Sequence, residues 1–321
     1  MQSLLDRKLL FITGKGGVGK TTMAATLGLL AAQEGRRTIV VEVGEQSRMA
    51  ELFGAAPAPA GDETRLQERL SSISIDPNRA LLEWLQALGG RVSGRLLASS
   101  GTFQYFAAAA PGAKELVSMV KIWQMTRAGR GRRSHDLVIV DAPATGHALG
   151  MLGSPQTFGA IARVGPIAGQ TRHVEELLKD RARTAYVAVA LATEMAVTEA
   201  LELQAGLERQ LDRELSAVIV NGLLPRRFST AEMAQIAALE QNGVSREDAR
   251  ASGMSAGEGR TIAAAAARAA RAVHERSRFQ HNQLARLRRR SFEVLSAPFV
   301  WGEGIDLEAV QLLARQLARK L

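Results

Sequence analysis

A glycine-rich segment that also holds lysines and threonines carries the clearest chemistry in this sequence. It reads G-K-G-G-V-G-K-T-T over residues 14–22. Glycines allow successive backbone N–H groups to point at one anion, and the closing lysine and threonine can contact phosphate and Mg²⁺. The pattern predicts a phosphate-binding loop, formed by Gly14, Lys15, Gly16, Gly17, Val18, Gly19, Lys20, Thr21 and Thr22.

The segments on either side of this loop are the ones that a nucleotide site needs. Lys8–Thr13 is typical of a buried strand, and residues 23–32 are typical of a helix. The positive end of the helix dipole favours an anion but repels Lys20, and a polyphosphate removes that conflict. We therefore expect ATP or ADP with Mg²⁺, with Lys20 on the β- and γ-phosphates and the Thr21 hydroxyl on the metal.

A second candidate element lies about 120 residues further along. The apolar run Leu137–Val140 ends at Asp141, and A-P-A-T-G-H follows. A carboxylate at a strand end can hold the Mg²⁺ shell and a water molecule near the γ-phosphate. We expect this role for Asp141, and we expect the Gly146 backbone N–H to approach the γ-phosphate.

The remaining apolar runs are short and alternate with helical patterns, which predicts an α/β fold with a doubly wound, mostly parallel sheet. The ligand then lies beyond the carboxyl ends of the strands. The two strands expected beside the motifs above are Lys8–Thr13 and Asp136–Asp141. The other expected strands are Thr38–Val43, Ser72–Ile75, Thr184–Leu191, Leu215–Val220 and Phe292–Ser296.

We expect a single domain over residues 1–321, with a helical subdomain built from about 80–134 and 227–290 and a loop over 244–260. The sequence contains no second glycine loop, so two sites would require two chains. The pattern of residues 115–125 places Leu116, Met119, Val120 and Trp123 on one helix face. Such a stripe can line a hydrophobic groove, but it is more often core.

Charge is distributed unevenly along the chain. The net charge is +9, and residues 260–290 hold nine arginines and one acid, Glu275, which is +8 in one segment. This segment is either the solvated face of a helix, which the low aromatic content favours, or a binding site for an anionic partner.

Composition also excludes several classes of site. The chain has no cysteine, so disulfides and thiolate metal sites are excluded. No apolar run reaches the roughly 20 residues that span a bilayer, and the N-terminus shows no signal-peptide pattern. A cytoplasmic location is the expectation.

Several of these segments together resemble the ArsA/Get family of ATPases, which includes arsenite-pump and tail-anchored-protein targeting ATPases. The loop carries the additional lysine, Lys15, of the deviant Walker A motif, and D-A-P-A-T-G-H-A-L from Asp141 resembles the family's switch II. I-D-P from Ile75, the segment from Ala109 to Leu116, and A-T-E-M in place of a P-E motif also correspond to family elements. The chain looks similar to the bacterial single-domain members.

The resemblance implies a three-layer P-loop NTPase fold and a homodimer in which Lys15 reaches the partner's nucleotide. It implies that Asn221 hydrogen-bonds adenine, that the segment from Ala297 to Gly304, including Pro298, closes over it, and that a hydrophobic client can be bound. The zinc-binding cysteine pair of the eukaryotic targeting ATPase is missing, so no zinc is expected. Soft thiolate binding of arsenic is impossible without cysteine, so an arsenite-pump role is disfavoured.

One departure from the family concerns the switch I segment after the second strand. The family's water-positioning aspartate corresponds here to Gly44, followed by Glu45. Either Glu45 or Glu42 substitutes, with Glu45 the better candidate, or hydrolysis is slow, or ATP is bound without turnover. We accordingly expect catalytic roles for Lys15, Lys20, Glu45 and Asp141.

Two other functional classes stay open at this stage. The chain could be an ATP-binding scaffold with little or no hydrolysis, which ATP turnover would distinguish. It could also be a ParA/MinD-like ATPase that contacts DNA or a membrane through residues 260–290, which salt-dependent binding would reveal.

Overall fold

The computed structural model describes residues 3–44, 47–59, 61–88, 112–127, 135–161, 166–242, 251, 253, 255–302 and 304–321. The strands are β1 (Leu9–Gly14), β2 (Thr38–Val43), β3 (Thr64–Gln67), β4 (Leu70–Ile75), β5 (Leu137–Ala144), β6 (Thr184–Leu191), β7 (Ala217–Leu223) and β8 (Glu293–Pro298). The helices are η1 (Leu4–Asp6), α1 (Lys20–Gln33), α2 (Arg48–Leu52), α3 (Pro77–Leu88), α6 (Ala113–Thr126), α7 (Thr145–Ile161), α8 (Pro166–Lys179), α9 (Glu194–Leu211), α10 (Thr230–Asn242), α12 (Ala256–Leu287) and α13 (Leu307–Leu317).

The described strands form one eight-stranded sheet in the order β3-β4-β2-β5-β1-β6-β7-β8. All neighbouring pairs are parallel except β3 with β4. Strand β1 is buried along its whole length, as expected for a strand covered on both faces. The α/β fold with a mostly parallel, doubly wound sheet is confirmed.

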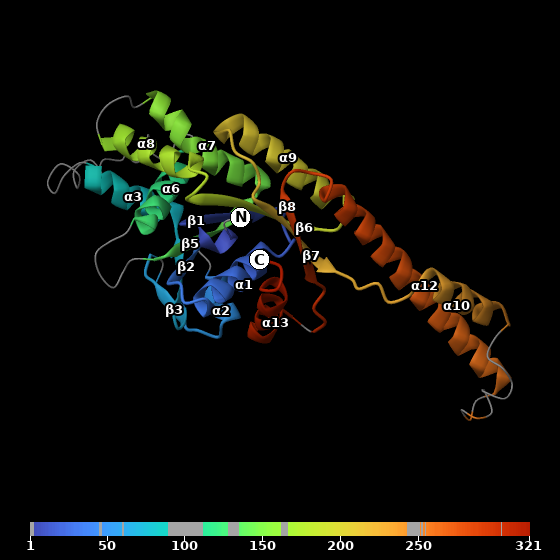
Figure 1. Ribbon diagram of the computed structural model, residues 1–321. Helices are drawn as coiled ribbons and strands as arrows, with labels where there is room; N and C mark the ends of the chain where they lie inside the picture. The colour runs from blue at the N-terminus through green and yellow to red at the C-terminus, as the bar shows by residue number, and fades with distance from the viewer. Residues whose placement is uncertain are drawn as a thin grey trace.

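Helices cover both faces of the sheet and produce three layers (Figure 1). On one face α1 packs against α13, and on the other α7 packs against α6, α8 and α9. The core runs along the central strands, where Leu10, Val140 and Val187 have no exposed surface.

The strand register brings chemically important residues to one edge of the sheet. Asp141 in β5 is level with Ile12 in β1 on one side and with Glu42 in β2 on the other. Asn221 in β7 is level with Leu191 at the end of β6. The carboxyl ends of five neighbouring strands, β2, β5, β1, β6 and β7, therefore converge where the glycine loop follows β1.

One strand escaped the sequence analysis. Strand β3 pairs antiparallel with β4 at the sheet edge, and Arg69, between the two strands, has a left-handed φ of 61°. The connection lacks the glycine or asparagine that usually marks a tight hairpin, so nothing in the sequence indicated a turn there.

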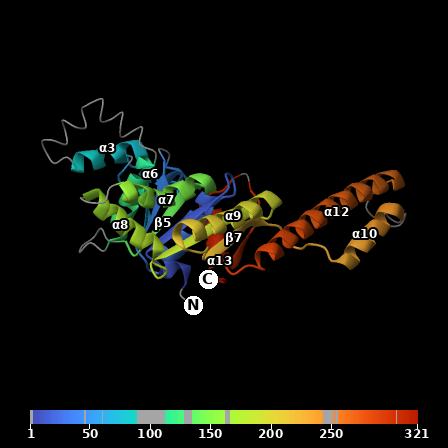
Figure 2. The same cartoon turned by 90° about the horizontal axis from the view of Figure 1, so that it is seen from above.

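The two helical stretches that were predicted to form one subdomain lie apart. Helices α3 and α6 pack on each other at one end of the sheet, whereas α10 and α12 form a hairpin that projects from the other end (Figures 1 and 2). We refer to α10 and α12 as the arm. A capping box between Ser255 and Glu258 starts α12, so residues 256–260 of the predicted loop are helical.

The apolar stripe of α6 belongs to the core. Leu116, Met119, Val120 and Trp123 are all buried, as the preferred interpretation of the sequence expected. Three aromatic residues that precede α6 in the sequence, Phe103, Tyr105 and Phe106, lie outside the described residues. Among the helices that the structure describes, none is long and apolar enough to cross a membrane.

Candidate active site

The glycine loop connects the end of β1 to the start of α1, and two of its glycines are required by close contacts. A Cβ on Gly14 would overlap the carbonyl oxygen of Val189, and one on Gly19 would overlap the side-chain nitrogen of Asn221. Gly19 also has a φ of 91°, which L-residues rarely adopt, and it caps α1. The loop backbone is therefore held closely between β6 and β7.

Lys20 begins α1 and its side chain folds back over the loop. The Nζ atom donates to the carbonyl oxygen of Lys15 at 3.1 Å. Partial burial lowers the pKa of Lys20, while the charge of Asp141 opposes that shift. A half-buried ammonium at a helix N-terminus, without a carboxylate at bonding distance, is well suited to a phosphate.

Thr21 and Asp141 meet directly, because β5 lies beside β1 in the sheet. The Thr21 hydroxyl donates to Asp141 Oδ2 at 2.6 Å. The other oxygen, Oδ1, is buried and has no partner among the described residues. Burial raises the pKa of Asp141, with Thr21 and Lys20 opposing the shift.

These atoms fit a Mg²⁺ ion. Mg²⁺ typically binds one or two protein oxygens and retains waters and phosphate oxygens as its other ligands. The unpartnered Asp141 Oδ1 beside a hydroxyl at the foot of the phosphate loop provides such oxygens. No cluster of three or more acidic or histidine side chains capable of enclosing a metal occurs in the described part of the chain, so a fully protein-bound metal is not indicated there.

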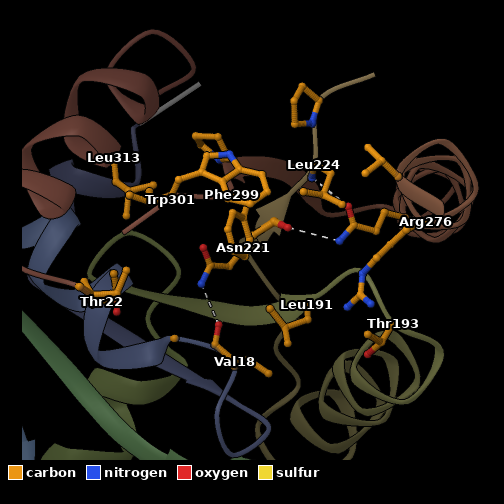
Figure 3. A pocket seen from close by; sticks show the side chains of 18 of the residues that line it. Val18, Thr22, Leu191, Thr193, Asn221, Leu224, Arg276, Phe299, Trp301 and Leu313 are labelled. Carbon is orange, nitrogen blue, oxygen red and sulfur yellow. Dashed lines mark hydrogen bonds between the residues drawn. The ribbon is translucent and has the colours of Figure 1, made fainter. Parts of the chain in front are cut away.

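Asn221 fixes the opposite side of the loop. Its amide nitrogen donates to the Val18 carbonyl oxygen at 2.9 Å, and Figure 3 shows the side chain pointing at Val18. Both residues line a cavity of about 690 Å³, together with Gly17, Gly19, Thr22 and Pro298. The predicted residues for phosphates and for adenine thus share one cavity, which is large enough for a nucleoside.

Four further side chains line this cavity: Phe299 and Trp301 belong to the segment expected to close over adenine, whereas Arg227 and Arg276 were not anticipated. Phe299 and Trp301 stack edge to face at 4.7 Å, and Trp301 is 67% exposed. Arg227 lies over the Trp301 ring at 5.7 Å. Arg276 enters from α12, so the arm contributes to the same cavity (Figure 3). Trp301 lies in a glycine-containing segment that the sequence analysis had noted, but no sequence motif indicated a role for Arg276.

The segment after Asp141 differs from its prediction. Strand β5 continues to Ala144 and α7 begins at Thr145, so Gly146 and His147 lie in the first turn of a helix rather than in a loop. Gly146 therefore presents its N–H at a helix N-terminus, where an anion is favoured. The Thr145 hydroxyl nearby is buried without a partner among the described residues.

Lys15 is engaged within its own chain. Its Nζ lies 2.8 Å from Glu199 Oε1 of α9, and both side chains are about a third exposed, at 35% and 29%. The role predicted for Lys15 across a dimer stays a prediction. Glu199 was not considered from the sequence, because nothing in a long helix distinguishes one acid from the next.

The switch I region is described except for two residues. Glu45, the favoured substitute for the missing aspartate, lies outside the described residues with Gln46. Gly44 has open space where a side chain would be. Glu42 is only 5% exposed and accepts hydrogen bonds from the Met49 backbone nitrogen at 3.0 Å and the Ser47 hydroxyl at 3.4 Å.

Burial raises the pKa of Glu42 to about 7, against the hydrogen bond from Met49. The partners of Glu42 are a hydroxyl and a backbone N–H rather than a basic side chain. This carboxyl instead ties β2 to the start of α2.

Thr193 also has an identifiable local role. It stands where a proline was expected from the resemblance, and its hydroxyl accepts from the Ala196 backbone nitrogen at 3.4 Å. It thereby caps α9, the helix that carries Glu199.

Comparison with known proteins agrees with the geometry. Residues 7–165 match the family model described as anion-transporting ATPase. The chain is 31% identical to ATPase BagA of Mycobacterium tuberculosis over 239 residues, which is 72% of this chain and 69% of that protein. It is 30% identical to ATPase GET3 of Paracoccidioides lutzii over 179 residues, 53% of this chain and 50% of that protein.

Proposed function

Since this chain belongs to the ArsA/Get family of P-loop ATPases, we propose that it acts as a homodimer that closes when its subunits hold MgATP and reopens after hydrolysis. The observation that carries the nucleotide part of this proposal is the buried, unpartnered oxygen of Asp141 beside Thr21 at the foot of the glycine loop. A carboxylate is costly to bury in this way unless a cation completes the site.

The residues of the site have different roles in phosphoryl transfer from ATP to water. Lys20 and the loop N–H groups bind the β- and γ-phosphates, and the Gly146 N–H binds a γ-phosphate oxygen. Thr21 and Asp141 hold Mg²⁺, which when bound neutralises charge on the phosphates. In the reaction the water oxygen bonds to the γ-phosphorus, the bond to the β–γ bridging oxygen breaks, and the water proton leaves to phosphate or solvent.

Adenine occupies the cavity between Asn221 and the segment that contains Pro298. Thr22 and Val18 close its phosphate side, and Phe299 and Trp301 supply aromatic surface. The arrangement serves ADP as well as ATP, so discrimination between them has to come from the γ-phosphate end.

The first test is phosphate release from MgATP by the purified chain. Lys20→Ala should reduce the rate by at least about 100-fold, because it removes a charged contact to the transferring group. Lys179→Ala is the matched control, since Lys179 lies on α8 and pairs with Glu175 at 2.6 Å. ATP binding without release would instead support the scaffold alternative.

The homodimer is tested through the Lys15–Glu199 ion pair. Lys15 has to leave Glu199 to reach a partner's nucleotide, so Glu199→Gln should tighten dimer formation in a non-hydrolysable ATP analogue, and Lys15→Ala should weaken it. Light scattering after gel filtration measures both. A chain that remains monomeric with the analogue at concentrations well above 10 μM would refute the proposed closure.

A hydrophobic client and a cytoplasmic location stay predictions. The apolar stripe of α6 is buried within the chain, so a client site would have to use other residues. Met195 on α9 and Leu312 on α13 are exposed apolar side chains that a client could contact.

A second candidate function concerns an anionic partner for residues 260–290. All nine arginines in this segment are exposed. Arg260, Arg268, Arg271, Arg278 and Arg286 fall within a sector of about 80° on α12, over about 39 Å of its length. We call these five residues the arginine stripe. Arg271 forms an ion pair with Glu240 of α10.

The stripe favours phosphates over a bilayer interior. Guanidinium groups bind phosphate oxygens in pairs, whereas the exposed apolar side chains on α12, Ile262 and Phe279, do not form a continuous face. Binding of a 24-base-pair DNA duplex at low salt, lost in Arg268→Glu/Arg278→Glu/Arg286→Glu and steeply weakened by salt, would support it. Absence of binding at low salt would remove it.

A further inference from the structure

Arg48 is the first residue of α2 and faces the phosphate end of the site. It lines a cavity of about 720 Å³ together with Thr21 and Thr22 at the start of α1 and with the acids Glu51 and Asp306. This cavity adjoins the one that holds Asn221 and Trp301, because Thr22 and Ile305 line both. A basic side chain therefore shares a space with the residues that we assign to Mg²⁺ and phosphate.

The backbone around Arg48 is tied down by a buried side chain. Glu42 accepts from Ser47 on one side of Arg48 and from Met49 on the other, at 3.4 and 3.0 Å. Glu42 is itself level with Asp141 in the neighbouring strand. The pairing of β2 with β5 and the hydrogen bonds of the Glu42 carboxylate therefore fix the position of Arg48 relative to Asp141.

Charges of both signs meet at this point, where Glu51 and Asp306 line the same cavity as Arg48. The charge of Arg48 acts on both Lys20 and Asp141, and it lowers the pKa of each. Lys20 and Arg48 thus both act on Asp141, one of whose two oxygens accepts a hydrogen bond from the Thr21 hydroxyl. Arg48 has no ion pair with any residue that the structure describes. An anion between Arg48 and Lys20 would complete the arrangement.

We infer that Arg48 binds the γ-phosphate of ATP within its own subunit and stabilises its charge during transfer, and that Glu42 is the positioning residue that holds Arg48 there. This inference rests on the proposed nucleotide site. It explains how the chain tolerates Gly44: phosphoryl transfer depends mainly on positioning and on charge stabilisation, so an added guanidinium offsets part of the loss of a water-positioning acid.

The test measures binding as well as turnover. In Arg48→Gln the affinity for ATPγS should fall by about 10- to 100-fold, as expected for a lost charged hydrogen bond, while the affinity for ADP changes by less than about threefold. Arg48→Lys should retain part of the ATPγS affinity. Arg65→Gln, on the exposed edge strand β3, is the matched control and should change neither.

Both nucleotides are titrated by calorimetry with Mg²⁺ present, so the result does not depend on hydrolysis. Equal loss of ATPγS and ADP affinity, or no loss of either, would overturn the role of Arg48. If the wild-type chain bound nucleotide without turning it over, the proposed ATPase cycle would fail while the binding ratio still decided the role of Arg48. Where turnover is present, Arg48→Gln should lower kcat by at least about 100-fold.

Glu42 is tested through non-additivity. Glu42→Ala should reproduce the loss of ATPγS over ADP selectivity, and Glu42→Ala/Arg48→Gln should be no worse than Arg48→Gln alone, because the first change acts through the second residue. A purely structural role for Glu42 predicts a lower melting temperature with unchanged selectivity. Additive effects on the ATPγS to ADP ratio would overturn the positioning role.

Discussion

The strand-end site and the arm differ in what determines their structure. At the strand ends, buried strands fix the backbone and every side chain has close neighbours, so Asp141, Glu42 and Asn221 can be held in costly positions. The arm is a hairpin of two helices whose buried apolar residues are few, such as Ala267 and Leu284. The site is stabilised by the fold around it, whereas the arm depends mainly on helix propensity and capping.

This difference teaches where substitutions should matter. Residues at the strand ends carry desolvated charges and tight backbone contacts, so single changes there should have large and specific effects. Residues on the exposed surface of the arm should tolerate change. Each experiment below can break or sharpen that contrast, beginning with the largest expected effect.

Asp141→Asn should abolish most turnover, with kcat lower by about 1,000-fold or more, because the metal-facing oxygen loses its charge. Without nucleotide the same variant should unfold at a higher temperature than the wild type, since burial of the ionised carboxyl is costly and the variant can still accept from Thr21. Phosphate release and thermal melts measure the two effects. Substantial remaining turnover would contradict the assignment.

Gly19→Ala should weaken ATP and ADP binding and destabilise the chain by about 1–3 kcal/mol, because φ is positive and the new methyl group would displace Asn221. Gly35→Ala is the matched control, because Gly35 has a similar φ of 88° but open space where the methyl group would lie. It should show the backbone strain alone and leave nucleotide affinity unchanged. Calorimetric titration and urea unfolding separate the two outcomes.

Glu42→Gln should stabilise the nucleotide-free chain at neutral to alkaline pH. The pKa of Glu42 is about 7 in the folded chain against 4.5 for an ordinary glutamate, so the folded state binds the extra proton. Its contribution is fully present below pH 4.5 and is lost as the pH rises through 7, by about 3 kcal/mol. Urea unfolding at pH 5 and pH 8 measures the change.

In that experiment the variant should gain stability over the wild type at pH 8 and lose the advantage at pH 5. Glu68→Gln, an exposed acid in the β3–β4 turn, serves as the control and should show no pH-dependent difference. An equal effect of Glu42→Gln at both pH values would mean that the buried carboxyl does not titrate as described.

Single alanine substitutions in the arginine stripe should have the smallest effects. Arg268→Ala and Arg278→Ala should each change the free energy of unfolding by less than about 0.5 kcal/mol and leave ATP turnover unchanged, because the side chains are exposed. Arg271→Ala removes the ion pair with Glu240 and is expected to cost up to about 1 kcal/mol. Larger losses would show that the arm is packed more firmly than its burial indicates.

The sequence predicted the central sheet and the glycine loop well, because both depend on local signals. Continuous apolar runs mark strands that are covered on two faces, and the G-K-G-G-V-G-K-T-T segment leaves few alternatives for β1 and α1. Thr21 and Asp141 were expected to serve the same Mg²⁺ ion, and the structure brings the two side chains into contact. Asn221 and Pro298 came from resemblance, and the cavity brings both of them to the loop.

What the sequence missed depends on tertiary structure. Glu199 is one acid among several on α9, and only the packing of that helix brings it to Lys15. Arg48 gains its importance from Glu42, which an unaligned sequence shows only as a strand-end acid. The separation of α3 and α6 from the arm follows from where each leaves the sheet, which helical periodicity does not encode.

The length of α12 has a mechanical consequence. Ala272, Val273, Arg276 and Gln280 of this helix line the cavity proposed to hold the nucleotide. Gln280 donates to the Gly222 carbonyl at 3.3 Å and accepts from the Leu224 N–H at 2.8 Å, so the base of α12 is tied to the end of β7. The part from Ala256 to Arg271 extends about 24 Å beyond that point. A tilt of about 10° at the base of α12 would therefore move its tip by roughly 4 Å, so a small change of angle at the cavity would become a larger displacement at the end of the arm.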